Sequence, residues 1–305
     1  MGRLGPANRR RSASQWCMDA VRLSDSLSAP QRSALTALIR NPIYELVPVA
    51  GMQQAAAALP ERASVTITAS PRLGIEATLD AAEWLAARGH DVCPHLAARS
   101  IRDRAHLADI LARIRGADIR KVFIVGGDGD AMGEFRDGLM LLQALASLDP
   151  WFHEIGVPSY PEGHPSIPDP VLMDDLRAKQ RYAHVTTTQM SFNPGAVASW
   201  IGRVREEGIE LPIHLGIPGV LQLRKLLTIG ARIGVAGSTR YLMKHRGLFG
   251  RLVTGNSFAP DALLALLAPT IGDARANVRA LHVFTMNQVA ETMKWRQSLM
   301  DELTA

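Results

Sequence analysis

The sequence predicts a (β/α)8 barrel, an α/β fold in which parallel strands close into a cylinder inside a layer of helices. Three observations predict it: short β-branched runs alternate with longer helix-like segments, about eight such pairs occur, and they recur every roughly 30 residues. A doubly wound open sheet is the alternative. Its usual nucleotide motif, G-x-G-x-x-G after the first strand, does not occur in the sequence.

Eight runs are typical of buried parallel strands, because they are short, apolar and rich in Val and Ile. In chain order they are Ile43–Val49, Ser64–Ala69, Asp91–Ala97, Lys121–Val125, Glu154–Pro158, His184–Met190, Leu211–Gly216 and Ala280–Thr285. Segments with helical spacing of apolar residues follow them: Met52–Leu59, Ile75–Arg88, Ile101–Arg115, Gly138–Ala146, Val171–Arg181, Gly195–Glu207, Val220–Thr228 and a C-terminal helix from about Asn287. Residues 230–279 exceed what one unit needs, and the pattern there assigns no element.

We divide the chain into an N-terminal extension, residues 1–40, and a single barrel domain, residues 41–305. Ala29-Pro30 begins a short helix of the extension, outside the barrel. The net charge is +5, but residues 1–16 contain four arginines and no acidic residue, which leaves 30 basic against 29 acidic groups in the rest. The basic charge therefore belongs to a flexible tail, and we expect no nucleic-acid partner.

The composition indicates a soluble, cytoplasmic protein. Hydrophobic residues make up 47% of the chain, which excludes low-complexity disorder for most of it. No apolar run approaches the roughly 20 residues of a membrane helix, and no apolar secretion segment follows the N-terminal arginines. Two cysteines, Cys17 and Cys93, are too few for a disulfide framework or a cysteine-built metal site.

Polar residues stand near the end of almost every predicted strand. In a barrel these ends meet at one mouth, where catalytic groups gather. Glu45 is the most informative, because a carboxyl in an apolar strand tends to keep its proton and suits a general acid; a buried ion pair is the alternative. Gly127-Asp128 suits either a tight turn or the approach of a flat ligand to the backbone. The other such residues are Thr66, Thr68, His95, Tyr160, Glu162, His164, Gln189, His214, Thr285 and Asn287.

The sequence predicts no metal site. Asp128-Gly129-Asp130 begins like a calcium-binding loop, but the position that requires Glu is Leu139. The histidines at strand ends have no ligand spacing, so a metal-dependent barrel hydrolase or lyase remains only an alternative. These histidines are His95, His164, His214 and His282.

One run of residues resembles a known family. Tyr160-Pro161-Glu162-Gly163-His164-Pro165, followed by Thr188-Gln189 one strand later, resembles the methylenetetrahydrofolate reductase family. Gly208-Ile209, Pro212-Ile213 and Gly216-Ile217 extend the resemblance, which runs from about Ile43 to Asn287. It implies a (β/α)8 barrel that carries FAD and passes a hydride from NADH or NADPH to the folate substrate 5,10-methylenetetrahydrofolate, which gives 5-methyltetrahydrofolate.

The resemblance also implies roles for individual residues. Glu45 matches the general acid that protonates N10 of the folate, and Asp128 matches the charge that stabilises the resulting iminium cation. Gln189 matches a residue that hydrogen-bonds the pterin, and Phe284 matches an aromatic side chain near the substrate. The positions that match FAD contacts are Thr66, His95, Gly127, Asp128, Tyr160, His164 and Lys179. Asp174 and Asp175 both align with a ribose-binding acid, and the alignment does not separate them.

The sequence departs from the family pattern near the flavin. Leu46-Val47-Pro48-Val49 replaces an aromatic and proline-rich motif, Gly126 stands where arginine is common, Ile67 where tyrosine is common, and Asn193 replaces an aspartate. These departures keep direct hydride transfer without flavin open. A reductase of another C1-folate and a folate-binding protein without activity also remain open. Since relatives often self-associate, a homo-oligomer is a further expectation.

Overall fold

Eight parallel strands form a closed barrel in the order β1-β10-β7-β6-β5-β4-β3-β2, which confirms the predicted fold class. The computed structural model describes residues 23–148, 151–222, 257–258 and 260–305, and every structural statement below concerns these residues. The barrel strands are β1 (Ile43–Leu46), β2 (Ser64–Ile67), β3 (Asp91–Ala97), β4 (Lys121–Val125), β5 (Glu154–Ser159), β6 (Val185–Thr188), β7 (Ile213–Pro218) and β10 (Val278–Phe284).

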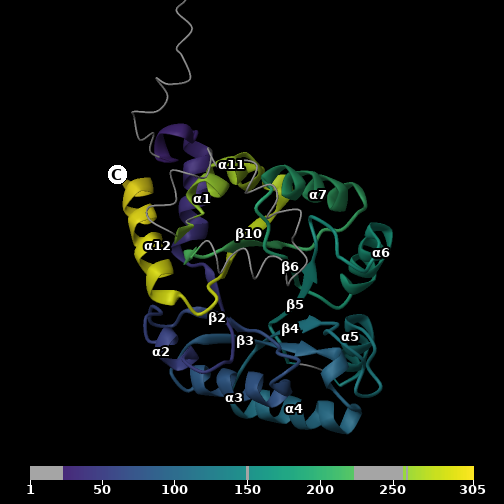
Figure 1. Cartoon of the computed structure of the whole chain (residues 1–305). Helices are drawn as coiled ribbons and strands as arrows, with labels where there is room; N and C mark the ends of the chain where they lie inside the picture. Colours follow the sequence, from purple (N-terminus) through teal and green to yellow (C-terminus); the bar gives the residue numbers. More distant parts are fainter. Residues whose placement is uncertain (1–22, 149–150, 223–256, 259) are drawn as a thin grey trace, which may run out of the picture.

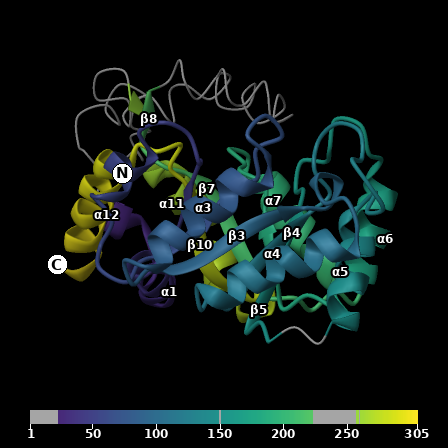
Figure 2. The same ribbon diagram turned by 90° about the horizontal axis from the view of Figure 1, so that it is seen from below.

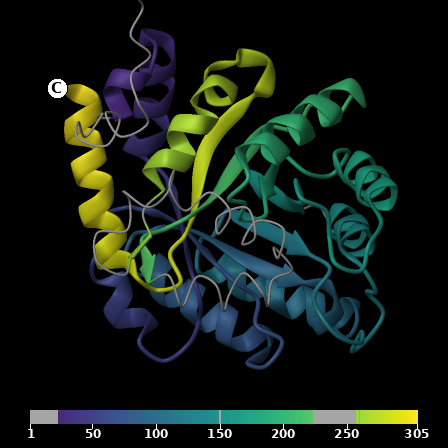
Figure 3. The same cartoon turned by 45° about the horizontal axis from the view of Figure 1, so that its top comes forward.

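Helices surround the barrel on its outside (Figures 1 and 3). They are α1 (Ala29–Arg40), α2 (Met52–Ala56), α3 (Gly74–Ala86), α4 (Arg104–Gly116), α5 (Gly138–Ser147), α6 (Asp169–Lys179), α7 (Pro194–Glu206), α11 (Asp261–Gly272) and α12 (Val289–Thr304). Short 3-10 turns lie at η2 (Leu23–Ser26), η3 (Ala98–Ser100) and η4 (Ala274–Ala276). Figure 2 shows α3 and α4 side by side along the outside of β3. Within the described part of the chain, no helix combines the length and apolarity that a membrane crossing requires.

Strand residues alternate between two environments. Outward side chains such as Leu46 on β1 and Ile67 on β2 are fully buried under the helices. Several inward positions carry polar side chains, among them Glu45, Thr66 and His282, all of which are buried. The helical layer therefore supplies most of the apolar core, while the interior of the barrel is partly polar.

The helix of the N-terminal extension adjoins the helical layer of the barrel. α1 begins with a capping box in which the Ser28 side chain accepts from the backbone of Gln31 and the Gln31 side chain accepts from the backbone of Ser28. It lies between α11 and α12 in Figures 1 and 3, and it contacts both helices and β10. Arg296 of α12 donates through Nε to the carbonyl oxygen of Ile39 over 2.9 Å, which ties the two helices together.

The predicted helix Val220–Thr228 is wrong at its start. Leu221–Gln222 form a short strand, β8, which pairs antiparallel with β9 (Ser257–Phe258). Backbone pairing with a distant segment replaces the local helical preference there, and the rest of the predicted helix lies outside the described residues. The interval left unassigned by the sequence contains α11, a helix with Pro269 inside it. Proline removes one helical hydrogen bond, which weakens the sequence pattern of this helix.

Candidate active site

A cavity of about 840 Å³ opens at the mouth formed by the carboxyl ends of the strands. Side chains of six barrel strands line it, together with the loops that follow β4 and β5. The predicted site residues that line it are Glu45, His95, Gly127, Asp128, Tyr160, His164, Lys179, Gln189 and Phe284. The fold therefore gathers residues that are more than 200 positions apart in sequence, as expected for a barrel mouth.

Glu45 is a buried carboxyl, only 6% exposed, on the inner face of β1. Its Oε2 lies 3.1 Å from Nε2 of His282 on β10 and 4.0 Å from Nε2 of His95 on β3. Neither contact is to a lysine or arginine, so the predicted alternative of a buried Lys or Arg ion pair is wrong among the described residues. The carboxyl group is held instead by a histidine hydrogen bond at the floor of the cavity.

The backbone around Glu45 is fixed by the turn that follows β10. The hydroxyl of Thr285 donates to the carbonyl oxygen of Glu45 over 2.6 Å. The Asn287 side chain accepts from the backbone N–H of Val47 and donates to its carbonyl oxygen, both at 2.9 Å. This amide replaces a strand partner at Val47, just after β1 ends and directly before Pro48, which carries no N–H. The sequence places Thr285 and Asn287 at a strand end. The structure shows that they hydrogen-bond the backbone of Glu45 and Val47, and so join the end of β10 to the end of β1.

Two of the four histidines considered from sequence meet at Glu45. Burial lowers the pKa of His95 to about 4, although the nearby Glu45 acts in the opposite direction, so this ring is neutral at pH 7. Burial likewise lowers the pKa of His214, on β7, to about 3. Among the residues that the structure describes, no group of three His, Cys, Asp or Glu side chains has an arrangement suited to a metal ion.

The loop after β4 carries Asp128 at the rim of the cavity, with an exposed side chain. The preceding Gly127 has φ +90°, and a Cβ there would lie 3.2 Å from Cβ of Ala97. The left-handed conformation favours glycine, and the close approach to Ala97 would add to the strain of any larger residue there. Arg99, in the η3 turn just after β3, holds the loop because its guanidinium donates to the carbonyl oxygens of Gly129 and Arg136, each over 2.9 Å. Sequence reasoning missed Arg99, whose only signal is its position two residues after the end of a predicted strand.

The far side of the cavity carries an aromatic pair and a buried cation. The rings of Tyr160 and His164 meet edge to face with centroids 5.1 Å apart. Burial, with smaller contributions from Asp175 and Asp128, raises the pKa of Tyr160 to about 12. Lys179 is 6% exposed and forms an ion pair with Asp175.

The structure separates the two aspartates that the sequence could not. Asp175 lines the cavity beside Lys179. Asp174 is exposed and pairs with Arg177 on the outside of α6. Only Asp175 can therefore contact a ligand in the mouth.

Thr66 lies deeper than the other predicted residues. It is 5% exposed, does not line the mouth cavity, and its hydroxyl has no hydrogen-bond partner among the described residues. Thr68, just beyond the end of β2, lines the mouth instead. Gln189 also reaches the cavity, and its Oε1 accepts from the backbone N–H of Met190 over 2.8 Å.

Phe284 depends on a glycine of the neighbouring strand. A Cβ on Gly216 would lie 2.8 Å from the Phe284 ring and 2.1 Å from the carbonyl oxygen of Thr188. Glycine at position 216 therefore lets the aromatic side chain sit at the mouth.

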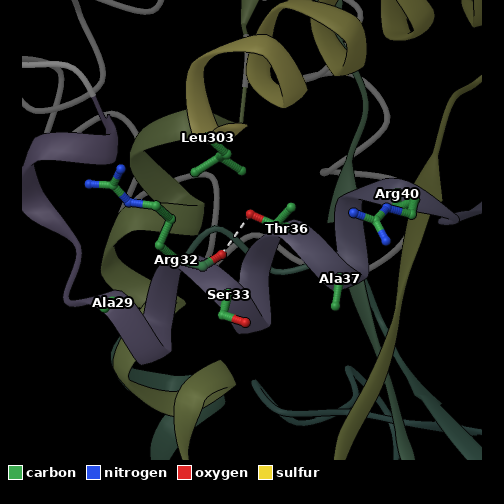
Figure 4. A pocket seen from close by; sticks show the side chains of 7 residues that line it. All are labelled: Ala29, Arg32, Ser33, Thr36, Ala37, Arg40 and Leu303. Carbon is green, nitrogen blue, oxygen red and sulfur yellow. Dashed lines mark hydrogen bonds between the residues drawn. The ribbon is translucent and has the colours of Figure 1, made fainter. Parts of the chain in front are cut away.

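A second hollow, of about 470 Å³, lies along the exposed face of α1 and differs from the mouth (Figure 4). The Arg32 guanidinium donates to the carbonyl oxygen of Ser24 over 2.8 Å, and the Thr36 hydroxyl donates to that of Arg32 over 2.7 Å. Leu303 of α12 stands at its edge (Figure 4). Since these polar groups already have backbone partners, the mouth cavity is the candidate active site.

Comparison with known proteins identifies the family. The sequence matches the family model of methylenetetrahydrofolate reductase over residues 46–237, which is more than half of the chain. The chain belongs to the methylenetetrahydrofolate reductase family. The match confirms the resemblance carried by Tyr160–Pro165 and Thr188-Gln189, and it makes the chain a member of an oxidoreductase family related to folate. Glu45 stands one residue before the matched region.

Solved structures similar to this chain are other proteins with low identity. A "putative lyase/mutase" from Burkholderia cenocepacia J2315 is 15% identical with a TM-score of 0.44, covering 91% of this chain and 88% of that one. Orotidine 5'-monophosphate decarboxylase from Sulfolobus solfataricus is 10% identical with a TM-score of 0.44, covering 86% and 99%. At these values the similarity bears on neither substrate nor chemistry.

The mouth of this methylenetetrahydrofolate reductase family member fits a flavin nucleotide. Its volume of about 840 Å³ is near the upper end of typical ligand pockets. Gly127 presents only backbone to the cavity, and the buried Lys179, which pairs with Asp175, places a cation at the cavity wall that suits a phosphate group. Nε2 of His95 is buried without a partner among the described residues, so it is available to a bound molecule.

Proposed function

We propose that the protein reduces 5,10-methylenetetrahydrofolate to 5-methyltetrahydrofolate with a hydride that originates from NADH or NADPH. The buried Glu45 at the floor of the mouth is the observation that carries this proposal, within a chain that belongs to the family. A ring-opening reduction of this kind needs one acid that reaches a substrate nitrogen while water is largely excluded.

Glu45 acts as the general acid in this proposal. The methylene bridge of the substrate becomes electrophilic when N10 is protonated and the five-membered ring opens. A carboxyl group with one oxygen hydrogen-bonded to His282 can present its other oxygen to N10. After the proton transfer Glu45 is a carboxylate, and the substrate carries the positive charge of an iminium.

In this proposal Asp128 stabilises the iminium cation, and Gln189 hydrogen-bonds the pterin ring of the folate. Asp128 lines the mouth with an exposed side chain, so its negative charge stabilises the iminium cation through the cavity. Gln189 brings an amide to the same cavity, and an amide can both donate to and accept from the pterin edge. Phe284 supplies an apolar wall for the substrate.

FAD is the proposed carrier of the hydride. His95, Gly127, Tyr160, His164 and Lys179 would hold it, with Asp128 beside it and Asp175 as the candidate ribose-binding acid. When bound, FAD accepts a hydride from the nicotinamide and passes it on to the folate. Thr66 does not line the mouth cavity, so its contact with FAD remains a prediction from the sequence alone.

The visible absorption spectrum of the freshly purified protein tests the proposal. We expect a flavin band that bleaches under anaerobic NADH or NADPH and returns when methylenetetrahydrofolate is added. Running the two reductants in parallel also identifies the one that the protein uses.

A colourless protein that stays colourless with added FAD, yet oxidises NAD(P)H when the folate is supplied, would support direct hydride transfer. Turnover of another C1-folate alone would replace the proposed substrate. Tight binding of the folate with no turnover under any reductant would contradict the proposed activity.

A further inference from the structure

We infer that His282 is a positioning residue that holds Glu45 through an Nε2–H donor and stabilises the carboxylate left after proton transfer. The inference rests on the proposed function of Glu45 as the acid. His282 is 1% exposed and Glu45 is 6% exposed, so water does not compete for their 3.1 Å contact. A hydrogen bond in such surroundings is stronger than one at the surface.

The two nitrogens of His282 have different surroundings, which fixes the tautomer. Nε2 faces Oε2 of Glu45, whereas Nδ1 is buried with no hydrogen-bond partner among the described residues. A proton on Nδ1 would lack an acceptor, while a proton on Nε2 has one. The neutral ring with its hydrogen on Nε2 therefore satisfies the geometry best.

The same tautomer sets the direction of the carboxyl group. When Oε2 accepts from His282, the acidic proton of Glu45 belongs on Oε1, for which the described residues offer no hydrogen-bond partner. Glu45 also lines the mouth cavity. The proton is thus presented to the ligand rather than to the protein.

The hydrogen bond grows stronger as the reaction proceeds. In the acid step, the O–H bond of Glu45 breaks and an N–H bond forms at N10, while the Nε2–H bond of His282 stays intact. The acceptor changes from a neutral carboxyl group to a carboxylate, and a hydrogen bond to an ionised acceptor is roughly twice as strong. Because the gain appears as charge develops, it accelerates proton transfer rather than binding.

Among the ionisable groups around this pair, only His282 lies within hydrogen-bond distance of the Glu45 carboxyl group in the described residues. His95 stands 4.0 Å from Oε2, beyond hydrogen-bond distance. His214 on β7 faces the interior near His282. Among the described residues, no lysine or arginine forms an ion pair with Glu45, which would favour the carboxylate and remove the acid.

The test compares His282→Gln with His282→Leu. The Gln side-chain nitrogen can take the place of Nε2 as a donor, whereas Leu fills the space without one. We expect His282→Leu to lower kcat for folate reduction by about 100-fold, with KM changed far less, and His282→Gln to stay within about 10-fold of native. Without the donor the carboxylate is less stable, so the alkaline limb of the pH profile of kcat should move to higher pH.

Two controls bracket these variants. His214→Leu removes another buried interior histidine that does not contact Glu45, and it should leave the pH profile in place. Glu45→Gln measures the loss of the acid itself. NAD(P)H oxidation with an artificial acceptor should be native in all four variants, because it requires no acid toward N10.

Nitrogen-15 NMR of the histidine-labelled native protein tests the tautomer without any turnover. We expect the Nε2 of His282 to be protonated and its Nδ1 unprotonated. The opposite tautomer, or a His282→Leu variant with native kcat and native pH profile, would overturn the inference. If Glu45→Gln reduces folate normally, the proposed function fails instead, and the two failures are thereby distinguished.

Discussion

The polar groups at the two ends of the barrel interior differ in burial and in hydrogen bonding. At the amino ends of the strands, Nζ of Lys121 contacts Oδ2 of Asp91 over 2.7 Å, and the Ser64 hydroxyl donates to the same oxygen over 2.9 Å. Toward the carboxyl ends, atoms of Thr66, His95 and His282 are buried without partners among the described residues.

The difference separates stability from function within one barrel. An unpartnered buried polar atom costs about 1–3 kcal/mol, because it has lost water and gained nothing. Three such atoms near Glu45 therefore destabilise the fold, and a ligand that bonds them would recover part of that cost. At the Lys121 end, charged and polar side chains instead pair with one another, as expected for the face of a barrel that serves stability.

Glu45→Gln should produce the largest effect of all. Gln keeps the size of the side chain and can still contact His282, but it has no acidic proton. We expect folate reduction to fall by about 1,000-fold or more, while NAD(P)H oxidation with an artificial acceptor stays close to native. Stopped-flow absorption separates the two half-reactions. An equal loss of both half-reactions would contradict the role of Glu45 as the acid. The carboxyl end of the barrel would then have no demonstrated catalytic group.

Acid pH should weaken the fold through the interior histidines. The pKa of His95 is about 4 in the folded protein and 6.5 in the reference state, so below pH 6.5 the unfolded chain takes up the proton first. The stability from the neutral ring is complete above pH 6.5 and is lost as the pH falls toward 4, by roughly 3 kcal/mol for His95.

Urea unfolding at several pH values between 7.5 and 4.5 measures this loss. His95→Gln should show a flatter decline than the native protein, whereas the exposed His153→Gln should not. An unchanged slope in His95→Gln would show that the ring is accessible to protons in the folded state.

Asp128→Asn should slow folate reduction by about 100-fold without loss of stability. The side chain is exposed, so its removal breaks no buried network, while the charge that faces the iminium disappears. The matched control is Asp130→Asn, another exposed carboxylate of the same loop that does not line the cavity. Steady-state kcat for the three proteins checks this, and equal effects at both positions would mean that only the charge of the loop matters.

The sequence predicted the barrel and most of its mouth because both depend on local patterns. Strands β3 and β4 have the predicted bounds, since Asp91–Ala97 and Lys121–Val125 are short apolar runs between clear breaks. Residues at the carboxyl ends of strands meet at one mouth in any barrel. The sequence alone was therefore enough to predict that Glu45, Asp128 and Gln189 lie in the same cavity.

Features that depend on side-chain geometry could not be predicted in this way. The pairing of Glu45 with His282 joins residues 237 positions apart, and it arises only when β10 closes the barrel against β1. The two aspartates at 174 and 175 have the same chemistry, and only the turn of α6 places one in the cavity. Pairing of Leu221–Gln222 with a strand 35 residues later likewise overrides a helical pattern.

Apart from its control, Lys121→Met has the smallest expected effect, and it tests the role of the amino end of the barrel in stability. Met preserves the aliphatic length and removes the charge that pairs with Asp91. The side chains are 28% and 42% exposed, so water screens the pair and we expect a loss of only about 1–2 kcal/mol in unfolding free energy. Turnover should stay native. Arg120→Met, which breaks a more exposed pair with Asp118, should cost less than about 0.5 kcal/mol. If Lys121→Met instead lowered kcat at unchanged stability, the amino end of the barrel would also serve the reaction, and the division between the two ends would fail.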